Sequence, residues 1–316
     1  MVLSAMQTTI LAFTAFMSAC SAGNAMGGGS SFDEARAWKD LEHLVSLGTR
    51  TPGSAALETT RAYLEQELTK AGLAPVREPF EVQPPEASGK PREPAKIAMA
   101  NVYADLKSKD PKAETVILCT HFDTKIGPMP ILGANDGGSG TAVLLELARV
   151  LAAAGPRDLT YRFLFLDGEE AIRWDWAGTD NTYGSRHHAG ELRKSGRAAS
   201  VRCCLLLDMV GDKDLRFLNE SLSNRRLSAI VSEAAASAGL SAHVDGRRAE
   251  ARDDHLSFMA VGIPSLDLID FDYGPDNAWW HTKEDTLDKC SPKSLGITGR
   301  IVLASLPLIE RGFARE

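Results

Sequence analysis

Short apolar runs alternate with stretches of helical periodicity from residue 97 to the C-terminal region. The runs are rich in Val, Ile, Leu and Phe and have the length of buried strands, whereas the intervening stretches repeat apolar residues every three or four positions. This alternation predicts an α/β fold with a mostly parallel sheet. The expected strands are Ala98 to Leu106, Thr115 to Cys119, Tyr161 to Leu166, Arg202 to Leu207 and Ile263 to Ile269, and the expected helices are Thr141 to Ala153, Leu222 to Ala238 and Ser294 to Leu308.

The segment before this alternation has a simpler pattern. Phe32 to Leu47 and Ala56 to Ala71 have helical periodicity, Val76 to Val82 alternates like an edge strand, and 84–94 is a polar, proline-rich loop. We therefore expect residues 32–316 to form one α/β domain, with a central mixed, mostly parallel sheet flanked by helices.

Polar side chains follow several of the expected strands directly. The strand ending at Leu166 leads into Asp-Gly and then Glu169-Glu170, and other strands end near His121 and Asp208. Ligands bind at the carboxyl ends of strands in open α/β sheets, so this placement favours a functional site. Of two adjacent carboxylates, one can bind a metal while the other transfers protons. The alternative for the glutamate pair is an exposed acidic turn.

A set of oxygen and imidazole ligands extends this observation. It comprises His121, Asp136, Glu170, Asp208 and His281, each at a strand end or in an adjacent loop. Such a ligand set suits zinc. The glycine-rich stretch around Asp136 is not a phosphate-binding loop, because the lysine of that motif is missing.

Charge and cysteine content narrow the function further. A net charge of -7 and no basic cluster argue against nucleic acid as a partner. Cys119, Cys203 and Cys204 lie in apolar runs and Cys290 has no metal-type spacing, so we expect buried thiols, with a disulfide left open.

The N-terminus resembles a bacterial lipoprotein signal. Residues 1–20 contain a short apolar run that ends in Met-Ser-Ala-Cys, and residues 21–31 form a Gly/Ser-rich tether. The expectation is an exported, cell-envelope protein that is anchored through Cys20 and contacts the membrane only by that lipid. A cleaved secretory signal and a cytoplasmic protein are the alternatives.

The order of the motifs resembles a known family. His-x-Asp, GANDGGSG, DGEE, LLLDMVG and WHTxxDT follow one another as in the zinc exopeptidases that include bacterial aminopeptidases and glutaminyl cyclases. EEAIRWDWAGTDNTYGSRH, the pattern DDHxxFxxxGxP and the Trp-His pair are similar to glutaminyl-peptide cyclotransferases in particular. The resemblance implies the three-layer fold of the zinc aminopeptidases and an enzyme that acts on peptides with N-terminal glutamine. We expect the protein to be a monomer.

The resemblance also implies roles for individual residues. Asp136, Glu170 and His281 would bind one zinc, and Glu169 would shuttle protons. The remaining assignments are Asp208 and Asp253 as partners that orient the attacking amine, and Trp176, rather than Trp174, together with Trp280 as walls of the substrate pocket. Both wall tryptophans have an alternative as core residues.

The implied reaction is cyclisation of N-terminal glutamine to pyroglutamate with release of ammonia. Two positions depart from the animal cyclases, since Gly137 replaces a serine and Asp267 replaces a histidine. A di-zinc aminopeptidase, with a second metal on His121, Asp136 and Asp208, is the alternative enzyme. A non-catalytic peptide-binding lipoprotein is the alternative outside enzymes.

Overall fold

The structure is a computed structural model that describes residues 31–83, 96–173, 176, 178–244 and 246–313. The expected signal with Cys20, residues 21–30 of the tether, the whole polar loop 84–94 and Trp174 lie outside these residues.

A six-stranded mixed sheet forms the centre of the fold, in the order β1-β2-β4-β3-β5-β8. The strands β4, β3, β5 and β8 are parallel, whereas β2 runs antiparallel to both β1 and β4. The strand bounds are β1 Val76–Val82, β2 Ile97–Leu106, β3 Thr115–His121, β4 Thr160–Leu166, β5 Val201–Asp208 and β8 Ser265–Ile269. The predicted mixed, mostly parallel sheet with β1 at its edge is therefore confirmed.

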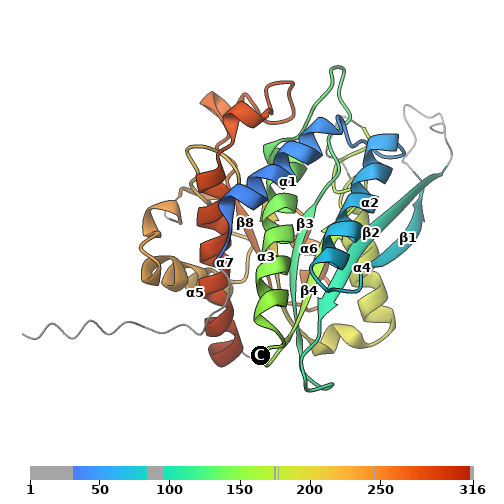
Figure 1. Cartoon of the computed structure of the whole chain (residues 1–316). Helices are drawn as coiled ribbons and strands as arrows, with labels where there is room; N and C mark the ends of the chain where they lie inside the picture. The colour runs from blue at the N-terminus through green and yellow to red at the C-terminus, as the bar shows by residue number, and fades with distance from the viewer. Residues whose placement is uncertain (1–30, 84–95, 174–175, 177, 245, 314–316) are drawn as a thin grey trace, which may run out of the picture.

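Helices cover both faces of this sheet, because alternate side chains of the strands enter two separate cores. Val116 and Leu118 pack with one set of helices, and Ile117 and Cys119 pack with the other. The first set is α1 (Glu34–Ser46), α2 (Ala55–Lys70), α3 (Gly140–Ala154), α5 (Arg225–Ser237) and α7 (Pro292–Gly312), and the second is α4 (Tyr183–Lys194) and α6 (His255–Met259). Helices α3 and α7 lie side by side (Figure 1). The three-layer arrangement agrees with the sequence-based expectation.

Two elements are shorter than their apolar patterns predicted. Helix α5 begins three residues after Leu222, because the backbone amides of Leu222 and Ser223 donate to the Glu220 carboxylate and Asn224 caps the helix. Strand β8 begins at Ser265, directly after a proline that cannot donate a ladder hydrogen bond. A side-chain cap in one case and a proline in the other therefore set boundaries that hydrophobic periodicity does not reveal.

The segment Asn135–Ala154 is the one helical stretch in the described part of the chain that is long and apolar enough to cross a membrane. It contains α3, and 78% of it is buried inside the protein. Its contacts with α1 and α7 on one side and β3 on the other are those of a core helix.

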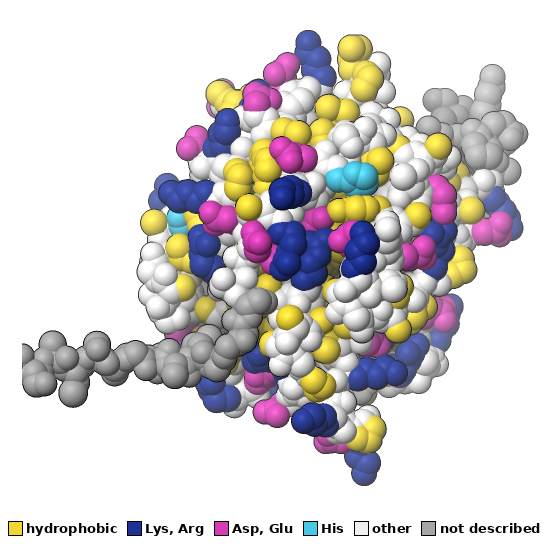
Figure 2. All heavy atoms as spheres, viewed as in Figure 1, with side chains coloured by type: hydrophobic (Ala, Val, Ile, Leu, Met, Phe, Trp, Pro, Cys, Tyr) yellow, Lys and Arg dark blue, Asp and Glu magenta, His cyan; other side chains and the backbone are white. Residues whose placement is uncertain are grey.

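The face formed by α1, α2 and α3 carries acidic and basic side chains interspersed with apolar ones (Figure 2). Ion pairs join three helices there: Arg149 contacts Asp40 at 2.5 Å and Glu67 at 2.7 Å, and Arg36 contacts Glu146 at 2.6 Å. Carboxylates thus neutralise the arginines on this face.

Arg50 is a buried cation that joins the loops at the carboxyl edge of the sheet. Its guanidinium donates to the carbonyl oxygens of Phe122, Leu132 and Gly133 at 2.8 Å each. Burial lowers the pKa of Arg50 to about 10, opposed by nearby carboxylates. These bonds tie the segment that follows β3 to the loop that precedes α3.

Replacing Arg50 by methionine is expected to destabilise the fold by about 3 kcal/mol, because three buried carbonyl groups lose their charged donor. Urea unfolding followed by circular dichroism measures this change. Arg247→Met, at an exposed arginine whose partner Asp272 is also exposed, is the control and should cost less than about 1 kcal/mol. Equal midpoints for the two variants would contradict a structural role for Arg50.

Candidate metal centre and active site

The predicted polar residues converge at one edge of the sheet. His121 is the last residue of β3 and Asp208 the last of β5, and Glu169 and Glu170 follow β4 after a two-residue turn. Because β4, β3 and β5 are parallel neighbours, their carboxyl ends meet. The loop after β8 brings His281 to the same place, so strand order and loop path together assemble the cluster.

Asp136, Glu170 and His281 form the first group of potential metal ligands. The Nε2 atom of His281 lies 3.3 Å from Asp136 Oδ2 and 3.1 Å from Glu170 Oε1. The ligand atoms of all three residues lie within 4.8 Å of one another. The structure thus brings together the three residues that the sequence singled out for one metal.

His121, Asp136 and Asp208 form a second group with the same spacing. The Nε2 atom of His121 lies 3.2 Å from Asp136 Oδ1 and 3.2 Å from Asp208 Oδ1. Asp136 is shared, with one carboxylate oxygen facing each histidine.

The first group fits a tetrahedral metal. Two ligands of a tetrahedral zinc, each 2.0–2.2 Å from the ion, lie about 3.3 Å apart, and the separations around His281 match this value. Asp136 Oδ2 and both carboxylate oxygens of Glu170 are buried without a hydrogen-bond partner in the described residues. Buried carboxylate oxygens are costly unless paired or bound to a cation, so a metal ion accounts for them.

The charges of the cluster support the same interpretation. Burial and the nearby Asp136 raise the pKa of Glu170, and burial raises the pKa of Glu169 well above its usual range. Burial opposes the charge on Asp136, but the imidazoles of His121 and His281 hold the pKa of its carboxyl well below its usual range. The buried carboxyl groups therefore outnumber the positive charges beside them, and a divalent metal ion would supply the missing positive charge.

Glu169 and Glu170 are adjacent in sequence but face different surroundings. Glu170 lies against His281, whereas Glu169 lines a cavity of about 180 Å³. Asp208, Asp253, Trp176 and Trp280 line the same cavity. Every residue predicted to be catalytic or to contact substrate thus reaches one pocket beside the first ligand group.

Two carboxylates that were given no role in the sequence analysis hold the ligand loops. Asp285 accepts hydrogen bonds from the backbone amides of Asn135 and Asp136, at 2.8 and 3.2 Å. Asp123 accepts from the amides of Glu169 and Glu170, at 3.1 and 3.2 Å. Each belongs to a motif already noted, His-x-Asp or WHTxxDT, so the signal was present, but only the structure reveals these backbone partners.

Unfavourable backbone conformations also occur at the site. Met209, next to Asp208, has φ of 50°, and His281 has φ of 56°. Left-handed conformations cost non-glycine residues free energy and gather at functional sites. The strain at His281 is consistent with a side chain that must point at Asp136 and Glu170.

The two departures from the animal pattern have structural counterparts. Gly137 has φ of 78°, and a Cβ atom there would lie 2.4 Å from the Asp123 carbonyl oxygen, so this backbone excludes serine. Asp267 is buried 3.9 Å from Nδ1 of His255, and burial raises the pKa of Asp267 and lowers that of His255 to about 4. Both shifts favour the uncharged forms of Asp267 and His255.

The four cysteines of the described chain, Cys119, Cys203, Cys204 and Cys290, are buried free thiols, as expected. The sulfur atoms of Cys119 and Cys204, on neighbouring strands, lie 3.3 Å apart. Burial raises the pKa of Cys119 well above its usual value, which favours the unreactive thiol form.

Trp280 is half-buried and stacks on the His281 ring, with 3.8 Å between ring centroids, while its edge meets Phe271. It lines the catalytic cavity and also a second, largely apolar cavity that includes Met129 and Ile131. The ring therefore contacts both a metal ligand and the space where substrate would lie.

Replacing Trp280 by alanine is expected to raise KM roughly tenfold while metal content changes little, because substrate loses an aromatic wall worth about 1.5 kcal/mol. Trp280→Phe is the matched control and should retain most of the affinity. Zinc analysis together with steady-state kinetics separates the effects, and an unchanged KM would assign the ring to packing alone.

The sheet topology and the paired ligand groups at its carboxyl edge define an α/β protein of the metallo-exopeptidase type. The chain matches peptidase family M28 over residues 101–306 and belongs to that family. It is 30% identical to a glutaminyl-peptide cyclotransferase-like protein of Mus musculus over 290 residues, covering 82% of this chain and 72% of the relative.

Solved structures agree with this assignment. The crystal structure of a glutaminyl cyclase from an Acidobacteriales bacterium is 32% identical, with a TM-score of 0.84 over 91% of this chain and 98% of the other. The glutaminyl cyclase of Fimbriiglobus ruber is 26% identical, with a TM-score of 0.77 over 89% of this chain and 96% of the other. The predicted family resemblance and fold class are thereby confirmed.

Proposed function

We propose that this protein is a zinc-dependent glutaminyl-peptide cyclotransferase, which converts N-terminal glutamine of peptides to pyroglutamate. The observation that carries the proposal is the arrangement around one small pocket. A buried Glu169 faces this pocket, Trp176 and Trp280 form its walls, and a separate group of metal ligands lies beside it. The names of the similar proteins support the same activity.

Asp136, Glu170 and His281 would hold the zinc ion. Bound there, zinc supplies Lewis-acid polarisation of the glutamine side-chain carbonyl. The three ligands come from separate loops, so a zinc ion bound there would connect these loops beside the pocket.

Glu169 is the proton-transfer group in this proposal. It takes a proton as the α-amine attacks the side-chain carbonyl carbon, and returns one to the departing amide nitrogen, so that a new C–N bond forms and ammonia leaves. Burial raises the pKa of Glu169, as this double role as base and then acid requires.

Asp208 and Asp253 face the same cavity and are suited to orient the α-amine. Burial and the nearby Asp208 raise the pKa of Asp253, which favours a protonated carboxyl that shares hydrogen bonds. The tryptophans limit the pocket to about one side chain, so that nucleophile and electrophile of a single residue are held together.

One observation favours a second candidate, a two-metal aminopeptidase. The Nε2 atom of His121 lies 3.2 Å from Asp136 Oδ1 and 3.2 Å from Asp208 Oδ1, a spacing similar to that of the first group. In that enzyme Glu169 would activate water for hydrolysis of the first peptide bond.

Mass spectrometry of a Gln-initiated peptide incubated with the zinc-loaded protein tests the proposal. The expected product has lost ammonia and retains every residue. Loss of the whole first residue would instead establish the aminopeptidase. An unchanged peptide, with zinc bound, would remove both enzymes from consideration.

A further inference from the structure

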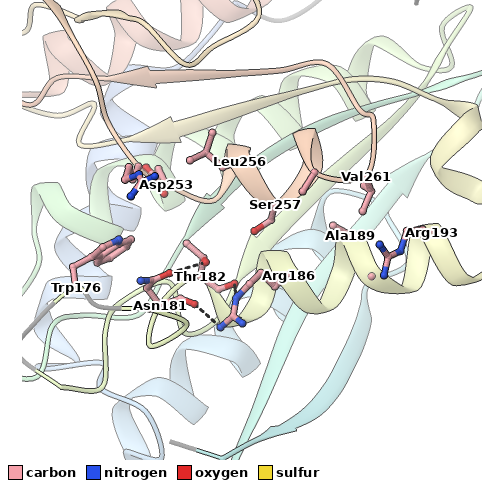
Figure 3. A pocket seen from close by; sticks show the side chains of 14 residues that line it. Trp176, Asn181, Thr182, Arg186, Ala189, Arg193, Asp253, Leu256, Ser257 and Val261 are labelled. Atoms are coloured by element: carbon pink, nitrogen blue, oxygen red, sulfur yellow. Dashed lines mark hydrogen bonds between the residues drawn. The ribbon is translucent and has the colours of Figure 1, made fainter. Parts of the chain in front are cut away.

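A third cavity, of about 480 Å³ and distinct from the apolar cavity beside Trp280, opens directly beside the catalytic pocket. The two share Trp176, Arg252 and Asp253. In Figure 3 the cavity extends from Trp176 and Asp253 at one end to Arg193 and Val261 at the other, between α4 and α6. For a peptide whose first residue lies in the catalytic pocket, this space is therefore adjacent to the residues that follow.

Three arginines line this cavity, and Asp253 at its inner end is the one carboxylate among the described lining residues. Arg186 and Arg193 are seven residues apart on α4, so they lie on one face, about 10 Å apart along the helix axis. Arg252 precedes α6, on the other side of the cavity. The cavity is thus cationic in a protein whose net charge is -7.

Two of these arginines, Arg186 and Arg193, have no carboxylate partner among the described residues, in contrast to many arginines elsewhere in the structure. The Arg193 side chain forms neither a hydrogen bond nor an ion pair with the described part of the chain, and Arg252 meets only Glu250, at 3.7 Å. Each of Arg36, Arg61, Arg77, Arg149, Arg157, Arg162 and Arg202 contacts a carboxylate within 3 Å.

Arg186 is held in place without being neutralised. Its guanidinium donates to the carbonyl oxygens of Thr179, Asn181 and Thr182, at 2.6, 2.7 and 3.3 Å. These acceptors engage Nε and Nη2 and leave Nη1 without a partner in the described residues. The side chain lines the cavity, and Figure 3 shows it below Ser257. A fixed guanidinium with a free N–H group is preorganised for an anionic oxygen.

We propose that this cavity, which we call the arginine subsite (Arg186, Arg193 and Arg252), binds a carboxylate of the substrate downstream of its N-terminal glutamine. The proposal rests on the proposed cyclase function and adds a substrate class, peptides with an acidic side chain shortly after the first residue. An extended peptide advances about 3.3 Å per residue, so the span between Arg186 and Arg193 corresponds to about three residues. We therefore expect the carboxylate that contacts the arginine subsite to belong to one of positions two to five of the peptide.

The test measures kcat/KM for amidated Gln-initiated pentapeptides that carry a single aspartate or, as the matched neutral substrate, asparagine at each of positions two to five. We expect aspartate to raise kcat/KM about five- to tenfold at one or more positions, mainly through KM, as one charge-assisted contact would. A Gln-initiated pentapeptide with alanine at positions two to five, made with a free or an amidated C-terminus, shows whether a terminal carboxylate has the same effect as a side chain.

Arg193→Gln is expected to reduce the aspartate-to-asparagine ratio to near one. Lys194→Gln is the matched control, because it removes the same charge from the adjacent residue, whose ammonium pairs with Glu191 and does not line the cavity. It should leave the ratio unchanged. A ratio equally reduced in both variants would indicate long-range attraction and overturn the subsite.

Failure of the subsite and failure of the cyclase remain distinguishable. If the wild-type protein cyclises the neutral peptides but aspartate gives no advantage at any position, the arginine subsite is wrong and the proposed function stands. If no Gln-initiated peptide is cyclised, neutral or acidic, the proposed function fails and the subsite fails with it as a determinant of cyclase substrates.

Discussion

Replacing Glu169 by glutamine is expected to lower kcat about 10²- to 10⁴-fold, the usual contribution of a general acid–base, while zinc stays bound. The amide of glutamine has the shape of the carboxyl group but cannot accept the amine proton. Glu169 lines the catalytic cavity and lies outside the Asp136–Glu170–His281 group. Kinetics of pyroglutamate formation and metal analysis of the same sample give the two readouts.

The neighbouring glutamate provides a matched comparison. Glu170→Gln makes the same chemical change one residue later, where the carboxylate faces His281, and is expected to reduce both zinc content and activity. Glu191→Gln, on the surface of α4, should change neither. Wild-type turnover by zinc-loaded Glu169→Gln would remove this residue from the mechanism.

Much of the site was predictable because it follows from strand order. In a parallel sheet, residues that end neighbouring strands are brought to one edge, so His121, Glu169 and Asp208 were expected to meet. Their strands are short apolar runs whose ends are visible in the sequence. His281 lies in a loop, so its place in the ligand set rested on its residue type and its position after the last strand, and the family resemblance assigned it to the first metal.

Other features depend on three-dimensional contacts that have no local sequence signal. Arg50 lies in the loop between α1 and α2, and its carbonyl partners are more than seventy residues away in sequence. Asp285 binds backbone amides that any residue type could supply. The pairing of Asp267 with His255 likewise appears only when β8 and α6 are packed together.

The arginine subsite illustrates the same limit. Arg186 and Arg193 have the spacing of one helical face, which the sequence contains, but exposed arginines on helices are common. Their significance comes from the absence of carboxylate partners in the described residues and from the cavity shared with the catalytic pocket, both of which require coordinates.

His281→Ala is expected to weaken zinc binding at least about 100-fold and to abolish turnover, because the zinc loses one of its three protein ligands. Loss of a residue that only hydrogen-bonds to a ligand already costs about 10- to 100-fold in metal affinity, so loss of the ligand itself should cost more. The remaining ligands, Asp136 and Glu170, are two carboxylates, and burial together with the repulsion from Asp136 raises the pKa of Glu170. Without the imidazole, that repulsion favours proton uptake over metal binding. Equilibrium dialysis against buffered zinc measures the change.

The backbone at position 281 requires a second variant. His281 has φ of 56°, a conformation that asparagine tolerates better than alanine, so His281→Asn removes the imidazole with less backbone strain. Both variants should lose zinc alike, whereas His187→Ala, at a histidine that stacks on Phe80, should bind it normally. Zinc retained by both position-281 variants would exclude His281 as a ligand.

The same zinc measurement, applied to a variant of His121, gives the number of zinc ions per chain. With one zinc on the first group, His121→Ala should leave one zinc per chain and lower turnover, since Nε2 of His121 contacts Asp136 and Asp208 beside that group. A wild-type protein that holds two zinc ions, one of which disappears in His121→Ala, would establish the second site and favour the aminopeptidase mechanism.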